Sequence, residues 1–348
     1  MIKSLNFLLI VFTLSSLACA QKNGDTLFVA HWNLENLFDT IDDPKTDDEE
    51  FVSGSAKEWG EERLDKKFYN LARVIRSMNN NNGPDLLGVC EVEHQDLLDS
   101  MLNKYLEDKS YKVGYLESQD GRGIDNGIIY NSKILNLIDI KGLKVSLDGG
   151  YNTRLIVYGT FLFQKKDTLH FFVNHWPSRR GGEDESGPRR ITAAKTLRTE
   201  VETLLAKNKN CKIIIVGDFN DEPTNISITE HLKAAPFFCD SLDHKNLQED
   251  LDTDLFNLSY KSWFDGVGSY KYQDDFNMLD QIIISKELLF ADEIKYVCNS
   301  FEVYKPYLMV TRTGKFEGAP FPTYGGSRYL GGYSDHFPVT AKFIFKRR

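Results

Sequence analysis

The sequence is poor in cysteine and lacks the closely spaced cysteine pairs that commonly mark a zinc site. Its five cysteines are scattered over 348 residues, so we expect no zinc site built from thiolates. Long apolar runs are absent beyond the first twenty residues, which excludes a transmembrane helix in the rest of the chain. Internal repeats and interdomain linkers are also absent. Residues 21–348 are therefore expected to form one domain.

An excess of positive charge is missing as well. The formal net charge is −9, whereas proteins that hold nucleic acid tightly by charge alone are usually basic. This negative net charge argues against a DNA-packaging protein. It remains compatible with an enzyme that binds phosphate locally, through a few arginines and lysines and a bound cation, and must release its product.

The first residues have the pattern of a secretory signal. A positively charged start is followed by a mostly apolar run at residues 5–17 and by the small-residue cleavage motif Ala18-Cys19-Ala20. We therefore expect residues 1–20 to be removed and the protein to be secreted or periplasmic. Two alternatives stay open: lipid modification of Cys19, which would anchor the protein to a membrane, and a buried N-terminal element.

Four cysteines follow this leader. Export permits disulfides between them, although their spacing does not pair them. Two of the four, Cys90 and Cys211, lie in apolar runs, where cysteine commonly serves as a small buried hydrophobe. The complete set is Cys90, Cys211, Cys239 and Cys298.

Strand-like and helix-like segments alternate along the chain. Apolar spacing of three and four residues predicts helices at 61–78, 95–106 and 189–207. An acidic stretch and an Arg/Gly-rich stretch, 39–50 and 178–190, are typical of surface loops. Short apolar runs predict strands at 26–32, 85–90, 127–130, 155–163, 169–173, 212–216, 279–285 and 339–345. The simplest interpretation is a mixed α/β protein.

Polar residues stand where several of these strands end, and strand ends can bring distant residues to one shared rim. Asp218 and Asn220 follow the apolar run at 213–216. Because they are two positions apart, they share a face in extended backbone. A carboxylate beside an amide suits orienting a water and holding a phosphate oxygen. The alternative is an Asx turn that caps the strand.

Two other strand ends offer candidate metal ligands. Glu91 ends a buried run, and hard cations such as Mg²⁺ favour carboxylate oxygens. Asn33 follows the first strand and is a candidate either to ligate the metal or to orient Glu91. Its neighbours Glu35 and Asn36 are candidates for capping a turn instead.

Histidines complete the pattern. His175 ends a strand just before Arg179, so a hydrogen-bond or proton donor stands beside a planar cation suited to phosphate. Asp280 lies inside an apolar strand, where a carboxylate is costly unless paired. Asp335 and His336 are adjacent and point to opposite sides of extended backbone, so one can face the metal while the other faces Asp280. His336 oriented by Asp280 would follow the logic of a carboxylate–imidazole base.

In this order, the motifs resemble the endonuclease/exonuclease/phosphatase superfamily, which includes DNase I-like nucleases, inositol polyphosphate phosphatases and bacterial sphingomyelinases. The resemblance covers residues 27–345 and depends most on GDFND at 217–221 and SDHFPV at 334–339. It implies a fold of the α/β (α+β) class. The expected architecture is a four-layer αββα sandwich, in which two packed mixed β-sheets are flanked by helices.

The resemblance also implies roles for individual residues. The metal would be Mg²⁺, with Mn²⁺ or Ca²⁺ as alternatives, held by Glu91 with Asn33 and Asp335 close to it. The base is left open between two members of the catalytic set, Asp218 and His336. That set comprises His175, Asp218, Asn220, Asp280 and His336. A looser match assigns substrate contacts to Arg154, Arg179, Asp125 and Asn126.

The expected function is therefore a secreted, divalent-metal-dependent phosphodiester hydrolase, an endonuclease that cleaves DNA or RNA by attack of water. The basic stretch beside His175 favours a polynucleotide. The alternative is a phosphatase or phosphodiesterase for a small or lipid phosphoester, such as an inositol phosphate or sphingomyelin. A non-catalytic binding protein would have no reason to keep the whole catalytic set. We expect a monomer without a stable protein partner.

Overall fold

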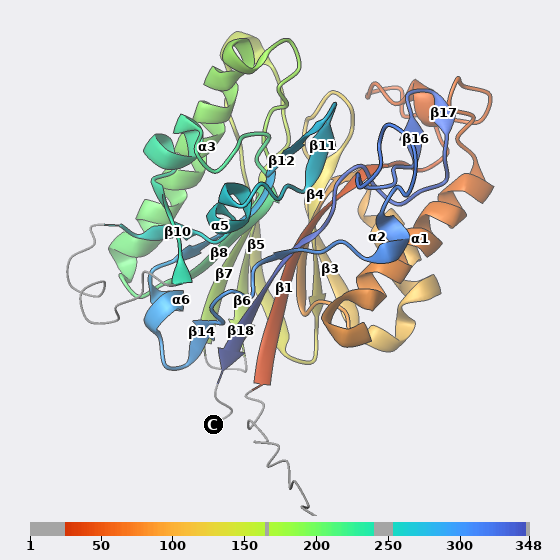
Figure 1. The fold of residues 1–348 in the computed structure, drawn as a ribbon. Coiled ribbons are helices and arrows are strands. Elements are labelled where there is room, and N and C mark those ends of the chain that lie inside the picture. Colours follow the sequence, from red (N-terminus) through yellow and green to blue (C-terminus); the bar gives the residue numbers. More distant parts are fainter. Residues whose placement is uncertain (1–24, 164–166, 240–252, 346–348) are drawn as a thin grey trace, which may run out of the picture.

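The computed structural model describes residues 25–163, 167–239 and 253–345 (Figure 1). Two seven-stranded sheets pack against each other, and helices cover their outer faces. The predicted four-layer α/β sandwich is therefore confirmed. The predicted leader at 1–20, with Cys19, lies outside the described residues, and the assignment of one domain to 21–348 stays a prediction.

The first sheet has the strand order β14-β18-β1-β2-β4-β3, with β15 also paired to β18. Its central pair, β1 and β2, is parallel, and both β18 and β4 run antiparallel to that pair. The strands are β1 (Asp25–Leu37), β2 (Leu86–Val92), β3 (Tyr111–Tyr115), β4 (Asp125–Asn131), β14 (Ile294–Tyr296), β15 (Glu302–Val303) and β18 (Val339–Phe345).

The second sheet has the order β5-β6-β7-β8-β13-β10-β9. Here β7 and β8 form the parallel pair, flanked by antiparallel β6 and β13. The strands are β5 (Leu135–Leu143), β6 (Ile156–Phe163), β7 (Asp167–His175), β8 (Lys212–Asp218), β9 (Ala234–Pro236), β10 (Leu255–Asn257) and β13 (Asp280–Ser285).

Three long helices form the outer layers: α1 (Glu61–Asn81), α2 (Gln95–Tyr105) and α3 (Glu183–Lys207). In Figure 1, α1 and α2 lie on one side of the paired sheets and α3 on the other. Strand β8 shows how the layers share a core. Ile213 and Ile215 pack with the apolar face of α3, whereas Ile214 and Val216 belong to the core between the sheets. Both faces of β8 are thus buried, which explains its continuous apolar sequence.

The two sheets approach closely near Gly88 of β2. A Cβ atom at this position would lie 2.6 Å from Cγ2 of Val216 in β8 and 3.0 Å from Cγ2 of Val173 in β7. The hydrogen of glycine therefore lets the central strands of the two sheets meet. Any larger residue at position 88 would push apart the strands whose ends carry the candidate site.

Helix α3 begins at Glu183, six residues before the predicted start at 189. The prediction of a surface loop over 178–190 is therefore wrong for its second half. Pro188 cannot donate a backbone hydrogen bond, but side chains hold this first part of the helix. Ser186 Oγ donates to the Gly182 carbonyl, and the Arg190 guanidinium donates to the Glu183 carbonyl.

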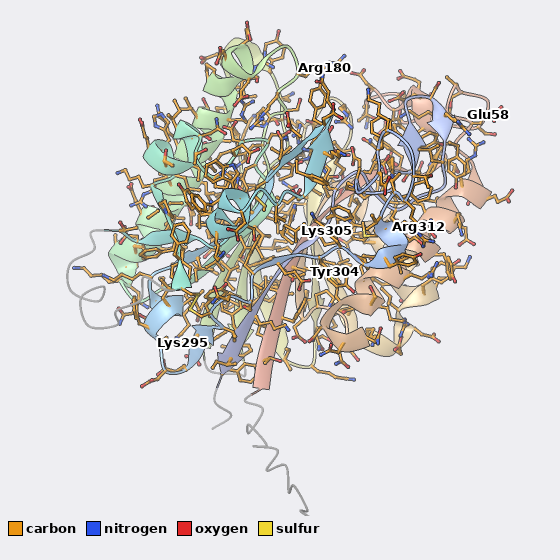
Figure 2. The ribbon with its side chains drawn as sticks, viewed as in Figure 1. Glu58, Arg180, Lys295, Tyr304, Lys305 and Arg312 are labelled. Carbon is orange, nitrogen blue, oxygen red and sulfur yellow. A yellow bond between two sulfur atoms is a disulfide. The ribbon has the colours of Figure 1, made fainter. Side chains whose placement is uncertain are left out.

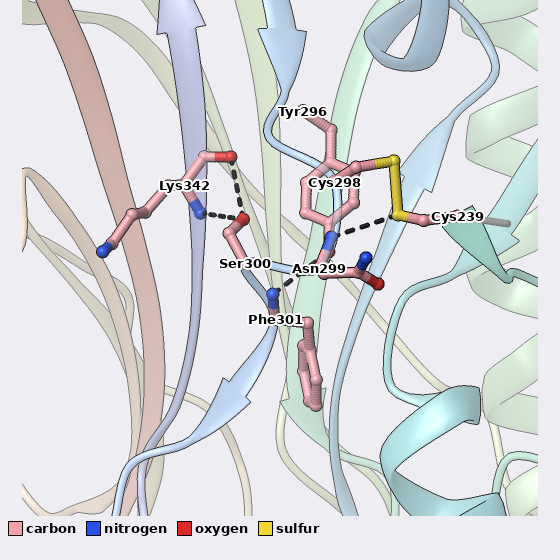
Figure 3. The surroundings of a disulfide bond; sticks show 7 residues. All are labelled: Cys239, Tyr296, Cys298, Asn299, Ser300, Phe301 and Lys342. Carbon is pink, nitrogen blue, oxygen red and sulfur yellow. Dashed lines mark hydrogen bonds between the residues drawn. A yellow bond between two sulfur atoms is a disulfide. The ribbon is translucent and has the colours of Figure 1, made fainter. Parts of the chain in front are cut away.

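A disulfide joins the two sheets at one edge (Figure 3). Cys239 follows β9, the last strand of the second sheet, and Cys298 follows β14, the last strand of the first. The backbone N–H of Asn299 donates to Cys239 Sγ. Cys90 and Cys211 are free and buried, as expected of small hydrophobes.

Two short hairpins and several short helices lie outside the two sheets and the three long helices. Two hairpins, β11–β12 and β16–β17, lie at the end of the sandwich where β1 ends (Figure 1). No described helix combines the length and apolarity needed to cross a membrane. The remaining elements are β11 (Tyr270–Tyr272), β12 (Asp275–Asn277), β16 (Tyr324–Gly325), β17 (Arg328–Tyr329), α5 (Tyr260–Phe264), α6 (Glu287–Phe290), η1 (Glu49–Phe51), η2 (Glu107–Lys109), η3 (Asp148–Gly150), η4 (Ser227–His231) and η6 (Tyr307–Met309).

Candidate active site

The predicted site residues gather at one end of the sandwich because of how the strands run. The parallel pairs β1–β2 and β7–β8 end there, while the antiparallel strands β4, β13 and β18 begin there. Asp218, the last residue of β8, pairs in register with His175 on one side and with Asp280 on the other. Residues 43 and 62 positions apart in the chain are thus fixed as direct neighbours.

Asp280 and His336 form a buried hydrogen-bonded pair. His336 Nδ1 lies 2.7 Å from Asp280 Oδ2, which also accepts a 2.6 Å hydrogen bond from Ser269 Oγ. Burial by itself would raise the pKa of Asp280, but the charge of His336 and hydrogen bonds from His31 and His336 hold that pKa below its ordinary value. Burial would lower the pKa of His336, yet the charges of Asp280 and Asp218 raise it well above the ordinary range. Asp280 therefore orients the His336 ring and favours its charged form.

Asp218 connects the two sheets and both site histidines. Its Oδ2 accepts a 3.1 Å hydrogen bond from Asn33 Nδ2 of the opposite sheet. The same oxygen lies 3.8 Å from the Nε2 atoms of His175 and of His336. Burial and the charge of Asp280 raise the pKa of Asp218. A carboxylate with these properties can accept a proton more readily than an exposed aspartate.

His175 stands between the two acidic groups. Its Nε2 is 3.8 Å from Glu91 Oε1 and 3.8 Å from Asp218 Oδ2. Burial and the positive charges of Arg154 and Arg122 lower the pKa of His175 well below its ordinary value, so its ring is neutral. The two histidines thus differ: their surroundings favour the neutral ring at His175 and the charged ring at His336.

Glu91 occupies a bulge in β2, where the pairing with β4 shifts between Cys90 and Val92. Its backbone has a φ of 62°, in the left-handed region that side chains rarely adopt. Its Oε2 accepts a 2.9 Å hydrogen bond from the backbone N–H of Asn36. Of the two roles considered for Asn33, orienting Glu91 is not seen, because the Asn33 amide donates to Asp218 and its Oδ1 accepts from the N–H of Glu35.

The acidic groups fit a divalent cation. Burial and the charges of Glu35 and Glu91 raise the pKa of Asp335 to about 7. The charges of His336 and of the fully buried Lys67, which lies 3.6 Å from Glu35, oppose this rise in the pKa of Asp335. Carboxylates this close repel one another unless a cation is shared. Glu91 and Asp335, with Asn33 nearby, are the donors that would hold it.

Asn220 and Arg179 hold the segment that follows β8. The backbone N–H of Asn220 donates to Asp218 Oδ1, and its side-chain amide donates to the carbonyl of Trp176. Arg179 Nε donates to the Asn220 carbonyl at 2.7 Å. Asn220 has a φ of 50°, which this network keeps in place. Arg179 therefore lies at the site, partly engaged with its backbone.

The other predicted substrate residues, Arg154, Asp125 and Asn126, are buried. Arg154 is buried and donates to Asp120 Oδ2 and to the Trp176 carbonyl. Asp125 accepts from the backbone N–H of Ser118, and burial raises its pKa to about 7. Asn126 donates to the carbonyl of Leu155, while its Oδ1 is buried without a partner. The positive charge of Arg154 nevertheless acts on His175.

One residue of the site, His31, was not expected from the sequence. His31 Nε2 lies 3.2 Å from Asp280 Oδ1, so Asp280 faces two histidines. The spacing His31-x-Asn33 on one strand was the available signal. The Tyr270 ring lies 4.7 Å from the His336 ring, centre to centre. Trp176 and Arg190, which lie near His175 and Arg179 in the sequence, are both buried, so neither is exposed to stack on a base or to bind a phosphate.

Comparisons agree with this arrangement. A family model described as the endonuclease/exonuclease/phosphatase family matches residues 28–345. The match, together with the paired sheets and the acidic–histidine edge, defines the class of protein as a metal-dependent phosphoester hydrolase. The chain belongs to the endonuclease/exonuclease/phosphatase family. No curated protein sequence gives a significant match.

Solved structures share the fold at low sequence identity. An endonuclease/exonuclease/phosphatase family protein of Bacteroides thetaiotaomicron is 16% identical, with a TM-score of 0.57 over 93% of this chain and 100% of that one. A mannosyl-6-phosphatase of the same organism is also 16% identical, with a TM-score of 0.57 over 92% of this chain and 100% of that one. Truncated TDP2 of Caenorhabditis elegans is 16% identical, with a TM-score of 0.54 over 92% of this chain and 97% of that one. At this identity the likeness shows the fold.

Proposed function

We propose that the protein is an exported, divalent-metal-dependent endonuclease that cleaves DNA or RNA by attack of water on the phosphodiester. The observation that carries the proposal is the position of Asp218 Oδ2, 3.8 Å from both His175 Nε2 and His336 Nε2 and bonded to Asn33. A base, a neutral donor and a cationic donor thus face the same small space, as hydrolysis of a phosphodiester requires.

The proposed division of labour follows from protonation. His336 already carries its proton, held by Asp280, so the better acceptor for the proton of the attacking water is Asp218. His175, which is neutral, donates a hydrogen bond to a phosphoryl oxygen as negative charge builds there. The imidazolium of His336 stabilises the same charge. A cation held by Glu91 and Asp335 would neutralise the phosphate and its leaving oxygen.

Basic side chains at the rim support a polyanionic substrate. Arg180 and Arg189 are exposed, and Arg179 is partly exposed beside Asn220. Figure 2 places Arg180 at the end of the molecule where the β11–β12 hairpin lies. Tyr272 of that hairpin is 61% exposed and could stack on a base. With a net charge of −9, such a local patch favours brief binding and release.

Export is proposed from two independent features. The first is the signal-like sequence at residues 1–20. The second is the disulfide between Cys239 and Cys298, because such bonds persist in oxidising compartments and are rare in the cytosol. Whether the mature protein is free or anchored through a lipid on Cys19 is decided by mass spectrometry of its N-terminus. The monomeric state is likewise a proposal, which sedimentation of the purified protein tests.

A lipid or small phosphoester is the second candidate. It is favoured by Tyr307 and Phe316, which are 73% and 55% exposed on the segment before Asp335. Exposed aromatic side chains can enter the boundary of a membrane.

The decisive experiment offers the purified protein plasmid DNA, RNA, nitrophenyl phosphate esters and sphingomyelin vesicles. Each substrate is tested with Mg²⁺, Mn²⁺ or Ca²⁺ and with a chelator, and a His336→Ala variant serves as the inactive control. We expect metal-dependent cleavage of a polynucleotide. Intact polynucleotides together with hydrolysis of a small or lipid ester would replace the nuclease by the second candidate.

A further inference from the structure

A second group of potential metal ligands lies apart from the candidate active site. One ligand atom each from Asp39, Glu93 and His94 falls within 4.8 Å of the others. Glu93 follows β2, and Asp39 belongs to the segment that leaves β1. Nothing in the proposed hydrolysis uses these three residues.

The histidine of this group is already oriented as metal-binding histidines are. His94 Nδ1 lies 3.2 Å from Glu117 Oε1, and because a carboxylate accepts, Nδ1 is the donor and Nε2 is the nitrogen available to a metal. Nε2 lies 3.7 Å from Glu93 Oε1. This separation is too long for a hydrogen bond, but it approaches the ~3.3 Å between two ligand atoms of a tetrahedral Zn²⁺.

Buried negative charge gathers around the same point. The Glu93 side chain is 2% exposed, and its Oε2 accepts the backbone N–H of Asp39 at 2.6 Å, so Oε1 is left for another partner. Asp48 is 1% exposed, its Oδ1 has no hydrogen-bond partner, and its charge acts on the Glu93 carboxyl. Within the described ranges, Asp39, Asp48 and Glu93 form no ion pair with a lysine or arginine, and the positive group that faces Glu93 is the His94 ring at 3.7 Å. Three carboxylates beside one imidazole leave an excess of negative charge, which is costly where it is buried.

We propose that Asp39, Glu93 and His94 bind a second divalent cation, with Asp48 as an additional carboxylate behind them. Carboxylate oxygens with one imidazole nitrogen suit a transition-metal ion such as Mn²⁺ or Zn²⁺ better than Ca²⁺, which takes oxygen ligands alone. The cation would take the place of the proton on His94 Nε2, neutralise the excess negative charge and hold the segment after β1 against the end of β2.

The site is separate from the candidate catalytic one but shares a segment with it. Glu91 accepts the backbone N–H of Asn36, and Glu93 accepts the backbone N–H of Asp39. Glu91 and Glu93 therefore bind the two ends of the same four-residue segment, 36–39. The second cation would stabilise this stretch independently of whether the first site acts on nucleic acid.

Mn²⁺ binding tests the proposal, with free Mn²⁺ followed by electron paramagnetic resonance. The wild type should bind two ions per chain, and His94→Ala and Asp39→Asn should each bind one. His231→Ala, which removes a histidine elsewhere, should still bind two. Because a catalytic ion could mask the effect, the sharpest comparison is Glu91→Gln with the double variant Glu91→Gln/His94→Ala. The former should retain one ion and the latter none.

Thermal unfolding supplies the second measurement. Mn²⁺ should raise the melting temperature of Glu91→Gln but leave that of the double variant unchanged. Equal binding and equal thermal shifts in these two variants would overturn the second site. If Glu91→Gln instead binds as many ions as the wild type, the proposed catalytic ligand is wrong, while the comparison within the Glu91→Gln background still decides the second site.

Discussion

Asp280 and His336 approach within 2.7 Å in a fully buried hydrogen bond, although 56 residues separate them in the chain. The contact fixes which nitrogen of the imidazole faces outward: Nδ1 is committed to Asp280, and Nε2 is left facing Asp218 at 3.8 Å. It also keeps the ring charged. Orientation and protonation of His336 therefore depend on one carboxylate.

Replacing Asp280 by Asn should slow turnover by roughly two to four orders of magnitude, because an amide neither holds the imidazolium nor enforces its tautomer. The variant should remain folded, since the amide is nearly the same size. Steady-state kinetics with circular dichroism checks this, and Asp275→Asn, on the exposed strand β12, is the matched control. Full activity of Asp280→Asn would remove the pair from the mechanism.

Removing the metal should abolish hydrolysis, and Glu91→Gln should raise the metal concentration needed for half-maximal activity by roughly tenfold or more. The amide keeps the size of the side chain but loses the charge that binds the cation. Titrations of chelated enzyme with Mg²⁺ and Mn²⁺ measure the effect. A titration curve identical to that of the wild type would exclude Glu91 as a ligand.

Replacing Lys67 by Met should destabilise the protein by about 3–5 kcal/mol, because it leaves Glu35 as a buried charge without its partner. Lys67 Nζ also donates to Thr323 Oγ1 and to the carbonyl of Tyr333, so the loop before Asp335 should loosen. Urea unfolding measures the loss. The exposed Lys66→Met is the control and should change stability little.

Reducing the disulfide should lower stability by ~4 kcal/mol, the chain-entropy value for a closed loop of 59 residues. The Cys239→Ser/Cys298→Ser variant should show the same loss and become insensitive to reductant. Because the bond lies at the sheet edges and not at the acidic–histidine site, turnover below the melting temperature should stay near that of the wild type. Differential scanning calorimetry with an activity assay tests both statements.

His170 should make folding sensitive to mild acid. Burial lowers its pKa to about 4, from an ordinary value of 6.5. The neutral ring is therefore favoured in the folded state, and the unfolded state binds the proton more readily. Its contribution to stability is complete above pH 6.5 and declines as the pH falls toward 4. Urea unfolding at several pH values should show a shallower decline in His170→Gln than in the wild type.

The sequence predicted the fold well where strands are buried on both faces. The runs around Ile214 and Ile283 are continuous and apolar, and β8 and β13 appear within a residue or two of the predicted bounds. Strands β3 and β5 were missed because they carry polar and charged residues, such as Lys112 and Asp139, on an exposed face. Their pairing with a neighbour, and not their own composition, makes them strands.

The sequence predicted which residues form the site, but not which of their atoms contact one another. Asp218, Asp280 and His336 are recognisable because polar groups at the ends of apolar strands are rare. Which atoms meet depends on how the two sheets face each other, and local patterns do not record this. The bond from Asn33 to Asp218 crosses between the sheets. The burial of Arg190 was also hidden, since its partner Asp221 lies 31 residues away.

The left-handed backbone of Glu91 and Asn220 has a consequence for attempts to improve the protein. Glycine would adopt a φ of 62° or 50° without strain, so Glu91→Gly and Asn220→Gly could unfold at higher temperature while losing the side chains that the proposed chemistry needs. Selection for heat resistance alone would then enrich inactive molecules. Directed evolution of this scaffold should screen both properties at once.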